Sequence, residues 1–262
     1  THCLFMDDDA SCEVDGIKRT LALLTYAKDK ELAVGGAMLR EETMYLQYEN
    51  GARFDGLLHP NKAGLDLRQQ NSCIVNEFEE RIDFCGWWFF AFPLSKVKHL
   101  AFPFFVRGDD IGFGLAHKFN IITLNGISSW QGDFALKHNP LTVYLDNRHQ
   151  IMQHFHHGDD EGLKNLLLIT ARMFMHNLLT YHYETAEAVI YSIQDVTNGK
   201  DFWKENVNMV EKRKQISALA KHEKPEDISL DLFAGAMGGN PHEGRMARLF
   251  RWATLNGHLL PT

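Results

Sequence analysis

The pattern of apolar residues changes near Pro140, and this change limits the fold of the chain more than any other feature. Before it, short apolar runs alternate with glycine, proline and aspartate, a pattern typical of strands and short helices joined by turns. After it, apolar residues recur at helical spacing, as in Leu166 and Met173. The sequence therefore predicts an α/β domain over residues 1–140 and an all-helical domain over residues 141–262.

The first domain is expected to contain one helix, several strands and two further apolar segments. We place the helix at residues 18–28, the strands at 32–39, 43–47 and 121–124, and the apolar segments at 84–92 and 102–106. Gly35 and Gly36 are adjacent and indicate a strand that is kinked or closely approached by another part of the chain. In the second domain the spacing predicts helices at residues 141–156, 162–194, 201–222 and 245–252.

Three consecutive aspartates, Asp7, Asp8 and Asp9, close an apolar run at residues 3–6. If the strand continues through them, Asp7 and Asp9 point to one side and Asp8 to the other. Two ionised carboxylates a few ångströms apart repel each other, and a hard divalent cation such as Mg²⁺ or Mn²⁺ relieves that repulsion. A simple acidic turn after a strand explains the triplet equally well.

Two more motifs suggest a binding cleft. Trp87 and Trp88 are adjacent, so in a strand they cannot both face one core, and one of them is expected in a cleft that suits the apolar side of a sugar. The alternative is that both are core or domain-interface residues. Asp109 and Asp110 follow a second apolar run. One of them could act as a general base on a hydroxyl, or cap the helix that follows, and the two roles are compatible.

The order of these motifs resembles the bacterial galactofuranosyltransferases, which are inverting, metal-dependent enzymes of glycosyltransferase family 2 with a GT-A fold. The motifs are MDDDA, VGGAML, DFCGWWFF, FPFFVRGDDIGFGL, ITLNGISSWQGDF and VYLDNRHQI. The resemblance runs from residue 1 to about residue 157, and the helical domain resembles the family only in character. It implies the carboxy-terminal part of a GT-A domain followed by a helical annex. Because a strand begins almost at residue 1, we expect an amino-terminally truncated sequence.

The resemblance implies a role for each residue that matches a family motif. Asp7 and Asp9 match the Asp-x-Asp that binds Mn²⁺ or Mg²⁺ and the UDP diphosphate. Asp110 matches the proposed catalytic base. Gly35 and Gly36 match a double glycine whose role we expect to be a backbone requirement.

The acceptor side of the resemblance rests on three residues. Trp87 and Trp88 match the Gly-Trp-Trp that forms the acceptor cleft in the family. Asp109 matches the acceptor-binding neighbour of the base.

The chain departs from the family at two positions. Gln131 stands where the family has the histidine that completes the metal site, and its neutral amide is a weaker ligand for Mn²⁺. His138 could replace that histidine only if its loop folds back. Asp146 replaces an arginine of the diphosphate-binding region, which leaves Asn147 and Arg148 as the expected diphosphate ligands there, with Arg148 compensating for the reversed charge.

The resemblance implies transfer of galactofuranose from UDP-galactofuranose to a glycan or lipid-linked glycan in cell-envelope polysaccharide synthesis. Two alternatives stay open. One is a related family 2 transferase that uses another nucleotide sugar, such as a rhamnosyl donor. The other is a non-catalytic scaffolding copy, which Gln131 and the missing upstream nucleotide-binding half make credible.

Bulk properties narrow the partners and the compartment. A net charge of −7 argues against a general nucleic-acid binder. The four cysteines show no CxxC pair and are typical of reduced thiols. The most apolar stretch, residues 85–94, has about half of the roughly 20 residues that a transmembrane helix needs. We expect a cytoplasmic protein, with peripheral association at the inner face of the membrane and homo-oligomer formation left open.

Overall fold

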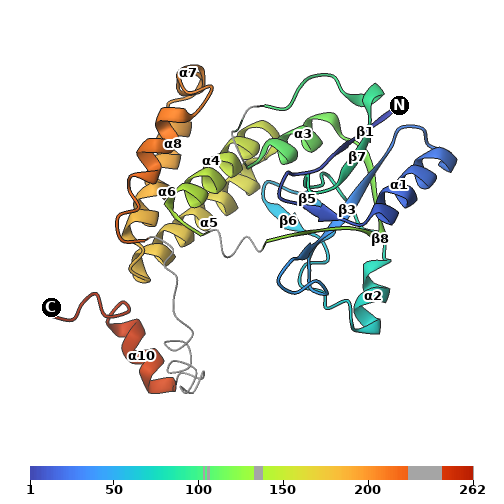
Figure 1. The fold of residues 1–262 in the computed structure, drawn as a ribbon. Coiled ribbons are helices and arrows are strands. Elements are labelled where there is room, and N and C mark those ends of the chain that lie inside the picture. The colour runs from blue at the N-terminus through green and yellow to red at the C-terminus, as the bar shows by residue number, and fades with distance from the viewer. Residues whose placement is uncertain (103, 105–106, 133–137, 224–243, 262) are drawn as a thin grey trace.

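The computed structural model describes residues 1–102, 104, 107–132, 138–223 and 244–261. Within these residues, a part built on a mixed sheet comes first and a helical part follows it (Figure 1). The helical part begins at Pro140, where the apolar pattern of the sequence changes. The predicted α/β class is confirmed at this level, whereas the features specific to a GT-A fold stay a prediction.

Six of the described strands form one mixed sheet in the order β1-β7-β3-β8-β2, with β4 paired to β3. The strands β3 and β8 run parallel, and the other pairs are antiparallel. The bounds are β1 (His2–Phe5), β2 (Ser11–Cys12), β3 (Leu32–Arg40), β4 (Gln47–Glu49), β7 (Phe90–Pro93) and β8 (Asn120–Gln131). A separate hairpin joins β5 (Ala52–Phe54) to β6 (Leu58–Pro60).

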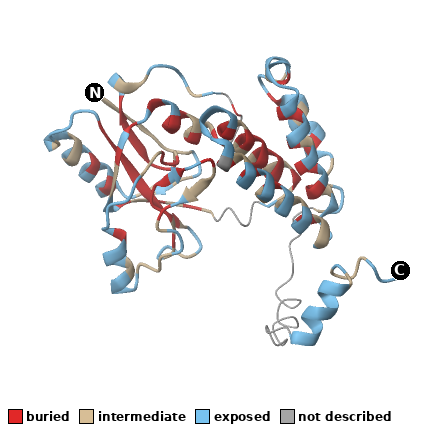
Figure 2. Ribbon diagram, turned by 180° about the vertical axis from the view of Figure 1, so that it is seen from behind, coloured by how far each residue is buried: buried red, intermediate tan, exposed pale blue. Residues whose placement is uncertain are grey.

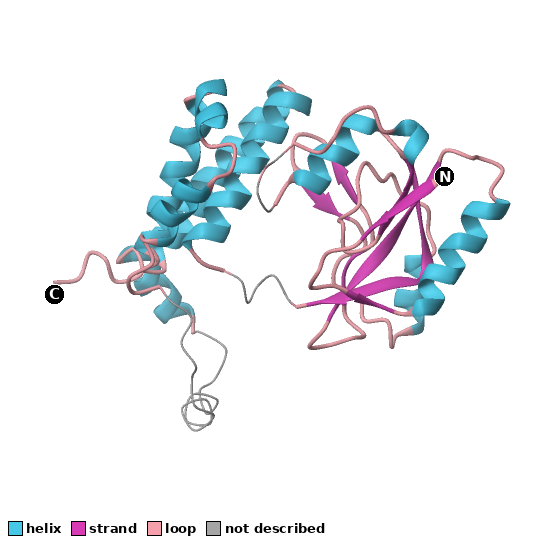
Figure 3. Cartoon of the chain, turned by 45° about the horizontal axis from the view of Figure 1, so that its top comes forward, coloured by secondary structure: helices cyan, strands magenta, loops and turns pink. Residues whose placement is uncertain are grey.

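Short helices surround this sheet, as the ribbon coloured by secondary structure shows (Figure 3). They are α1 (Val14–Tyr26), α2 (Gln70–Asn76), the single 3-10 turn η1 (Leu94–Lys96) and α3 (Asp109–His117). Helix α1 lies against β8, where Arg19 donates a hydrogen bond of 2.7 Å to the carbonyl of Gly126. Helix α3 begins directly at the two aspartates singled out in the sequence.

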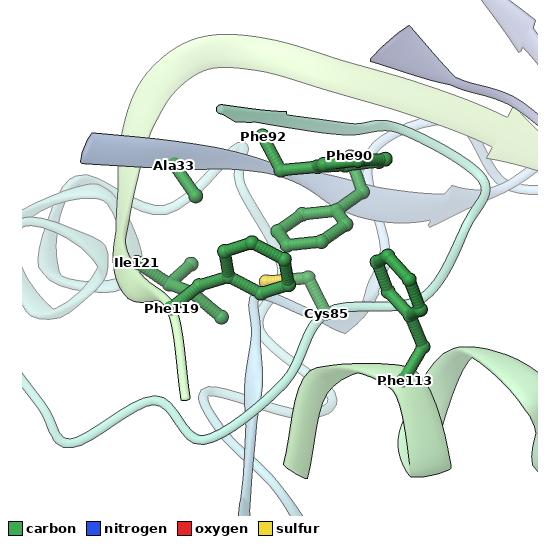
Figure 4. Packing of buried hydrophobic residues seen from close by; sticks show 7 residues of the cluster. All are labelled: Ala33, Cys85, Phe90, Phe92, Phe113, Phe119 and Ile121. Carbon is green, nitrogen blue, oxygen red and sulfur yellow. The ribbon is translucent and has the colours of Figure 1, made fainter. Parts of the chain in front are cut away.

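Aromatic residues of β7 and α3 form the core that fixes α3 on the sheet (Figure 4). Phe90 and Phe92 alternate with Phe89 and Ala91, so the two pairs enter the clusters on opposite faces of the sheet. The ring of Phe113 in α3 lies 5.3 Å from that of Phe92, in an edge-on arrangement that aromatic pairs favour. The start of α3 therefore has a fixed position relative to the sheet edge.

The helical part packs around a second core. Its helices are α4 (Pro140–His157), α5 (Asp160–Leu179), α6 (Tyr183–Thr197), α7 (Lys200–Glu205), α8 (Val210–Ser217) and α10 (Arg245–Ala253). Asn139 is the N-cap residue of α4 and forms a capping box with Thr142. The Asn139 side chain accepts a hydrogen bond from the amide of Thr142, and the Thr142 side chain accepts one from the amide of Asn139. In Figure 2 the helices of this part other than α10 carry buried residues, whereas α10 has the colour of exposed residues throughout. No helix in the described ranges is both long and apolar enough to cross a membrane.

Several expected elements differ in the structure. The expected helix at 162–194 is two helices, because Tyr181 adopts a left-handed backbone (φ 65°) between α5 and α6. The expected helix at 201–222 is also two helices, separated by residues 206–209, of which Met209 has φ 52°. Residues 43–45 form a turn, and the short strand there is β4. Residues 103, 105 and 106 of the second apolar segment lie outside the described residues.

Candidate functional site

A cleft of about 790 Å³ lies between the sheet part and the helical part. On the sheet side it is bordered by the ends of β1 and β8, by β4, and by the start of α3; on the helical side it is bordered by α4. The cleft brings together most of the residues predicted from the sequence, which are Asp7, Asp9, Trp87, Trp88, Asp109, Asp110 and Gln131.

The aspartate triplet forms a turn at the end of β1. The amide of Ala10 donates to the carbonyl of Asp7 at 3.2 Å, which closes a turn over Asp8 and Asp9. Strand alternation therefore does not apply to Asp8 and Asp9, and the structure shows the alternative of an acidic turn after the strand. All three aspartates border the cleft. The turn places the three aspartates at one edge of the sheet, beside the cleft.

Gln131 lies beside the triplet because β2 pairs with the end of β8, with Ser11 opposite Trp130. Its side chain is buried, and its Nε2 donates to a carboxylate oxygen of Asp9. Its Oε1 is buried without a hydrogen-bond partner among the described residues. The position expected to complete a metal site thus contacts one of the two expected metal-binding carboxylates.

Asp109 and Asp110 occupy the first turn of α3, and Gly108 is the N-cap residue with φ 93°. The alternative that either aspartate is the N-cap is therefore wrong, although Asp110 Oδ1 accepts a 2.7 Å bond from the amide of Ile111. Burial, the carboxylate of Asp109 and then that of Asp7 raise the pKa of Asp110 to about 7. Burial likewise raises the pKa of Asp109.

Glu49, the last residue of β4, is a cleft residue that the sequence analysis missed. It is only 7% exposed, and its Oε1 has no hydrogen-bond partner in the described part of the chain. Burial and then the Asp110 carboxylate raise the pKa of Glu49 to about 8. A signal was available: Gln47 and Glu49 are polar residues at alternate, inward positions of one short strand.

Trp87 and Trp88 lie in a turn directly before β7, so they face different environments. Trp88 Nε1 donates to the carbonyl of Gly36 at 3.1 Å and its ring joins the core. The ring of Trp87 packs edge-on against Phe5 at 4.9 Å, and its Nε1 is buried without a hydrogen-bond partner among the residues described. Both tryptophans also border the cleft, so the two sequence interpretations are both partly met.

Gly35 and Gly36 serve close packing, as predicted. A Cβ at Gly35 would lie 2.2 Å from Cys85 Sγ, and one at Gly36 would lie 2.8 Å from Phe89 Cβ. The register between β3 and β8 shifts between Gly35 and Ala37, which is the predicted kink. These glycines let the segment with the two tryptophans lie directly on β3.

An ion pair that was not expected from the sequence joins the start of α3 on the sheet side of the cleft to α4 on the helical side. Arg107 Nη1 donates to both carboxylate oxygens of Asp146 at 2.7 and 2.9 Å. His149 lies next to them, with its Nε2 3.8 Å from Asp146. Burial, Arg107 and Arg148 lower the pKa of His149 to about 3, so this imidazole is neutral. Arg107, not Arg148, compensates the charge of Asp146.

The structure does not bring Asn147 and Arg148 to the cleft. Arg148 is 0% exposed, with its guanidinium against Met209 and the carbonyl of Phe104. Asn147 is also buried and donates to Ser192 Oγ at 2.7 Å. Their expected contact with a diphosphate is therefore corrected: both point into the helical core because they lie on the inner side of α4.

His138 does not replace the family histidine in this arrangement. Its ring lies 6.0 Å from that of His182 in the helical part, and it is not among the residues that border the cleft.

The side chains of the cleft limit how a metal ion could be bound there. Among the described residues there is no group of three or more His, Cys, Asp or Glu side chains that could hold one. A cation would rely on the carboxylates of Asp7 and Asp9 with an amide oxygen from Gln131. These are hard oxygen donors of the kind that Mg²⁺ and Mn²⁺ accept. The unpartnered Oε1 of Gln131 is available for this role once the amide rotates by about 180°, which exchanges its oxygen and nitrogen.

Comparison with known proteins identifies relatives of one kind. The chain is 27% identical over 218 residues to galactofuranosyltransferase GlfT2 of Mycolicibacterium smegmatis, covering 76% of this chain and 33% of that protein. It is 25% identical over 219 residues to galactofuranosyltransferase GlfT2 of Mycobacterium tuberculosis, covering 76% and 34% respectively. The chain thus spans about a third of the length of these relatives. No protein-family model matches it.

Proposed function

We propose that this chain forms the metal and acceptor side of an inverting glycosyltransferase active in cell-envelope polysaccharide synthesis. The donor we propose is UDP-galactofuranose, and the acceptor is a hydroxyl of a glycan or lipid-linked glycan. The observation that carries the proposal is the position of Asp110, which shares a half-buried cleft with the Asp7–Asp9 turn and with Trp87 and Trp88. The similarity to two galactofuranosyltransferases supports the choice of sugar.

Asp110 has the properties of a general base. A carboxyl group with a pKa of about 7 is a much better proton acceptor near neutral pH than an ordinary aspartate, and still ionises there. In the proposed step the acceptor oxygen attacks the anomeric carbon from the face opposite the leaving group, which inverts the configuration. The new carbon–oxygen bond forms, the bond to the diphosphate breaks, and the acceptor proton passes to Asp110.

Asp7 and Asp9, with Gln131, would hold a divalent cation and the donor diphosphate. When bound, that cation supplies positive charge to the departing diphosphate, an effect worth several kcal/mol in sites of this kind. Trp87 and Trp88 would form the apolar floor for the acceptor sugar, and Asp109 would accept a hydrogen bond from one of its hydroxyls.

The test is nucleotide release by the protein incubated with Mn²⁺, a glycan acceptor and a panel of UDP- and dTDP-sugars. Asp110→Asn is expected to lower kcat by about 10²- to 10⁴-fold, with little change in Mn²⁺-dependent UDP binding. Asp201→Asn, at an exposed aspartate of α7, is the matched control and should leave the rate unchanged. An unchanged rate in Asp110→Asn would show that the base assignment is wrong. A dTDP-sugar as the preferred donor would instead support the related transferase.

One observation favours a non-catalytic copy as the second candidate. Gln131 already donates a hydrogen bond to Asp9, an arrangement that satisfies this carboxylate without a metal. Gln131→His is expected to tighten Mn²⁺ binding if the side chain faces the ion, whereas Gln69→His, at an exposed position, should not. Absence of both turnover and Mn²⁺-dependent UDP binding in the unaltered protein would contradict the enzyme and favour this candidate.

A further inference from the structure

The cleft contains many carboxyl groups and few cations. Among the described residues that border it, the side chains with a permanent positive charge are those of Arg107 and Arg213. His149 also borders the cleft, but its imidazole is neutral because burial lowers its pKa to about 3. A diphosphate is an anion, and guanidinium groups bind phosphate oxygens with charge-assisted hydrogen bonds. One of the two arginines is therefore expected to contact the diphosphate of a donor.

The backbone at Arg107 holds this residue against the helical side of the cleft. Arg107 and the next residue, Gly108, both have a left-handed backbone, with φ 86° and 93°. A residue with a side chain rarely adopts this conformation unless its surroundings hold it there. A Cβ at Gly108 would lie 2.6 Å from that of His149, so this backbone lies directly on α4. Asp146 lies about one helical turn before His149 and is thereby within reach of Arg107.

Arg107 is the main cation that faces the Asp146 carboxylate. Both carboxylate oxygens accept hydrogen bonds from Arg107 Nη1, and both side chains border the cleft. Burial raises the pKa of Asp146, and Arg107 opposes this rise more than His138 does. A phosphate group presents its oxygens to a guanidinium in the same way as a carboxylate does. Asp146 thus occupies the place at Arg107 that a phosphate group could take.

We propose that Asp146 competes with the donor diphosphate for Arg107. Before the donor binds, the Asp146 carboxylate pairs with the guanidinium across the cleft. When the diphosphate binds, Arg107 turns to it and the ion pair breaks. The free energy of the ion pair is lost from donor binding, so this pair limits the donor affinity. The inference rests on the proposed function, because the diphosphate is the leaving group of that reaction.

Arg213 is less well placed for this role. It extends from α8 in the helical part and is exposed. The residues proposed to act in the transfer, Asp7, Asp9 and Asp110, lie on the sheet side of the cleft, after β1 and at the start of α3. Arg107 lies on that side as well, directly before the N-cap residue of α3.

The test is isothermal titration calorimetry of the 262-residue chain with inorganic pyrophosphate and Mg²⁺, a probe without sugar or nucleoside. Asp146→Asn is expected to tighten binding about fivefold, because a partly exposed ion pair no longer has to break. Asp146→Ser also lacks the charge and should tighten binding equally. Arg107→Gln should weaken binding about tenfold. A merely structural role of Asp146 would instead give weaker binding in both of its variants.

Further variants separate the ion pair from a general effect of charge. The double variant Arg107→Gln with Asp146→Asn should bind pyrophosphate within about twofold of Arg107→Gln alone, because the competition needs both partners. Asp201→Asn removes the same charge from the exposed pair Lys204–Asp201 on α7, outside the cleft, and should bind like the unaltered chain. Arg213→Gln should weaken binding less than Arg107→Gln does.

Three results would overturn the proposal: no pyrophosphate binding by either the unaltered chain or Asp146→Asn, no tighter binding after Asp146→Asn, or equal tightening when Arg107 is already Gln. A loss of binding in Arg213→Gln but not in Arg107→Gln would assign the diphosphate to α8 and also overturn it. Sugar transfer is measured separately. The expected binding pattern without transfer would contradict the proposed function alone, whereas transfer without this pattern would contradict this inference alone.

Discussion

Individual carboxyl groups of the cleft bind protons more tightly in the folded chain than in the unfolded one. The pKa of Glu49 is raised to about 8 and that of Asp110 to about 7, mainly because burial disfavours the ionised form. Compared with high pH, the fold is more stable at low pH, where these groups are neutral in both the folded and the unfolded chain. This contribution is lost as the pH rises from the unfolded pKa through the folded one.

Glu49→Gln should therefore change how stability depends on pH. Between the ordinary pKa of glutamate, 4.5, and about 8, the ionisable side chain costs the fold up to about 1.4 kcal/mol per pH unit. The variant lacks this term, so its free energy of unfolding should fall less between pH 5 and pH 8. Urea unfolding at the two pH values measures the difference.

Glu211→Gln is the control, since Glu211 is 82% exposed on α8 and should leave the pH profile as it is. A Glu49→Gln profile parallel to that of the unaltered chain would show that Glu49 ionises freely in the folded cleft.

The close approach of β3 to the segment before β7 is a property of these elements. Gly35→Ala would push a Cβ into Cys85 Sγ, at 2.2 Å, and overpacking of this kind costs about 1–3 kcal/mol. Adding Cys85→Ala removes the sulfur and should recover part of that loss. The coupling energy of the two substitutions, measured by urea unfolding, is therefore expected to be clearly favourable.

Gly16→Ala in α1 is the matched control, because its nearest neighbour would lie 3.9 Å away. It should stabilise the chain slightly, by up to about 1 kcal/mol, since alanine favours a helix more than glycine does. Additive effects of Gly35→Ala and Cys85→Ala would contradict the contact.

Sequence patterns predicted the presence and type of the helices and strands better than the residues at which they begin and end. The helical spacing at 162–194 was right, but one left-handed residue, Tyr181, splits it into α5 and α6. The close packing at the glycines of β3 was correctly predicted, because a residue without a side chain lets another part of the chain approach the backbone. The turn at Asp7–Ala10 was one of two interpretations left open, since a charged residue after a strand is compatible with either continuation or a turn.

On the scale of the whole molecule, the Arg107–Asp146 pair links the start of α3 to α4 across the cleft. Replacing Arg107 by Gln, Asp146 by Asn, and both together forms a double-mutant cycle. The expected coupling is about 1 kcal/mol, discounted because both side chains are partly exposed. It should shrink at high salt, and urea unfolding measures it.

The exposed pair Lys18–Asp15 on α1 provides the control cycle, with a coupling expected near zero. Equal couplings in the two cycles would mean that the pair across the cleft adds nothing beyond an ordinary surface contact.

The cleft itself was only partly predictable. Asp7, Asp110 and Gln131 carry chemical signals in the sequence, and they do meet in space. Arg148 carried the same kind of signal but faces the helical core, because the side of a helix that turns inward depends on its packing partners. For Glu49 the alternation of Gln47 and Glu49 in β4 indicated an inward side chain, but its place beside Asp110 depends on how β4 folds onto the sheet.

The contact between Cys85 and Gly35 also means that the reactivity of Cys85 can be used to follow the opening of the sheet at this point. Cys73 is exposed, Cys3 and Cys12 are half-buried, and Cys85 is buried, where burial also raises the pKa of its thiol. A thiol reagent should therefore modify Cys73 first and Cys85 last. Mass spectrometry during labelling would time how often the sheet separates at this contact, without any engineered probe.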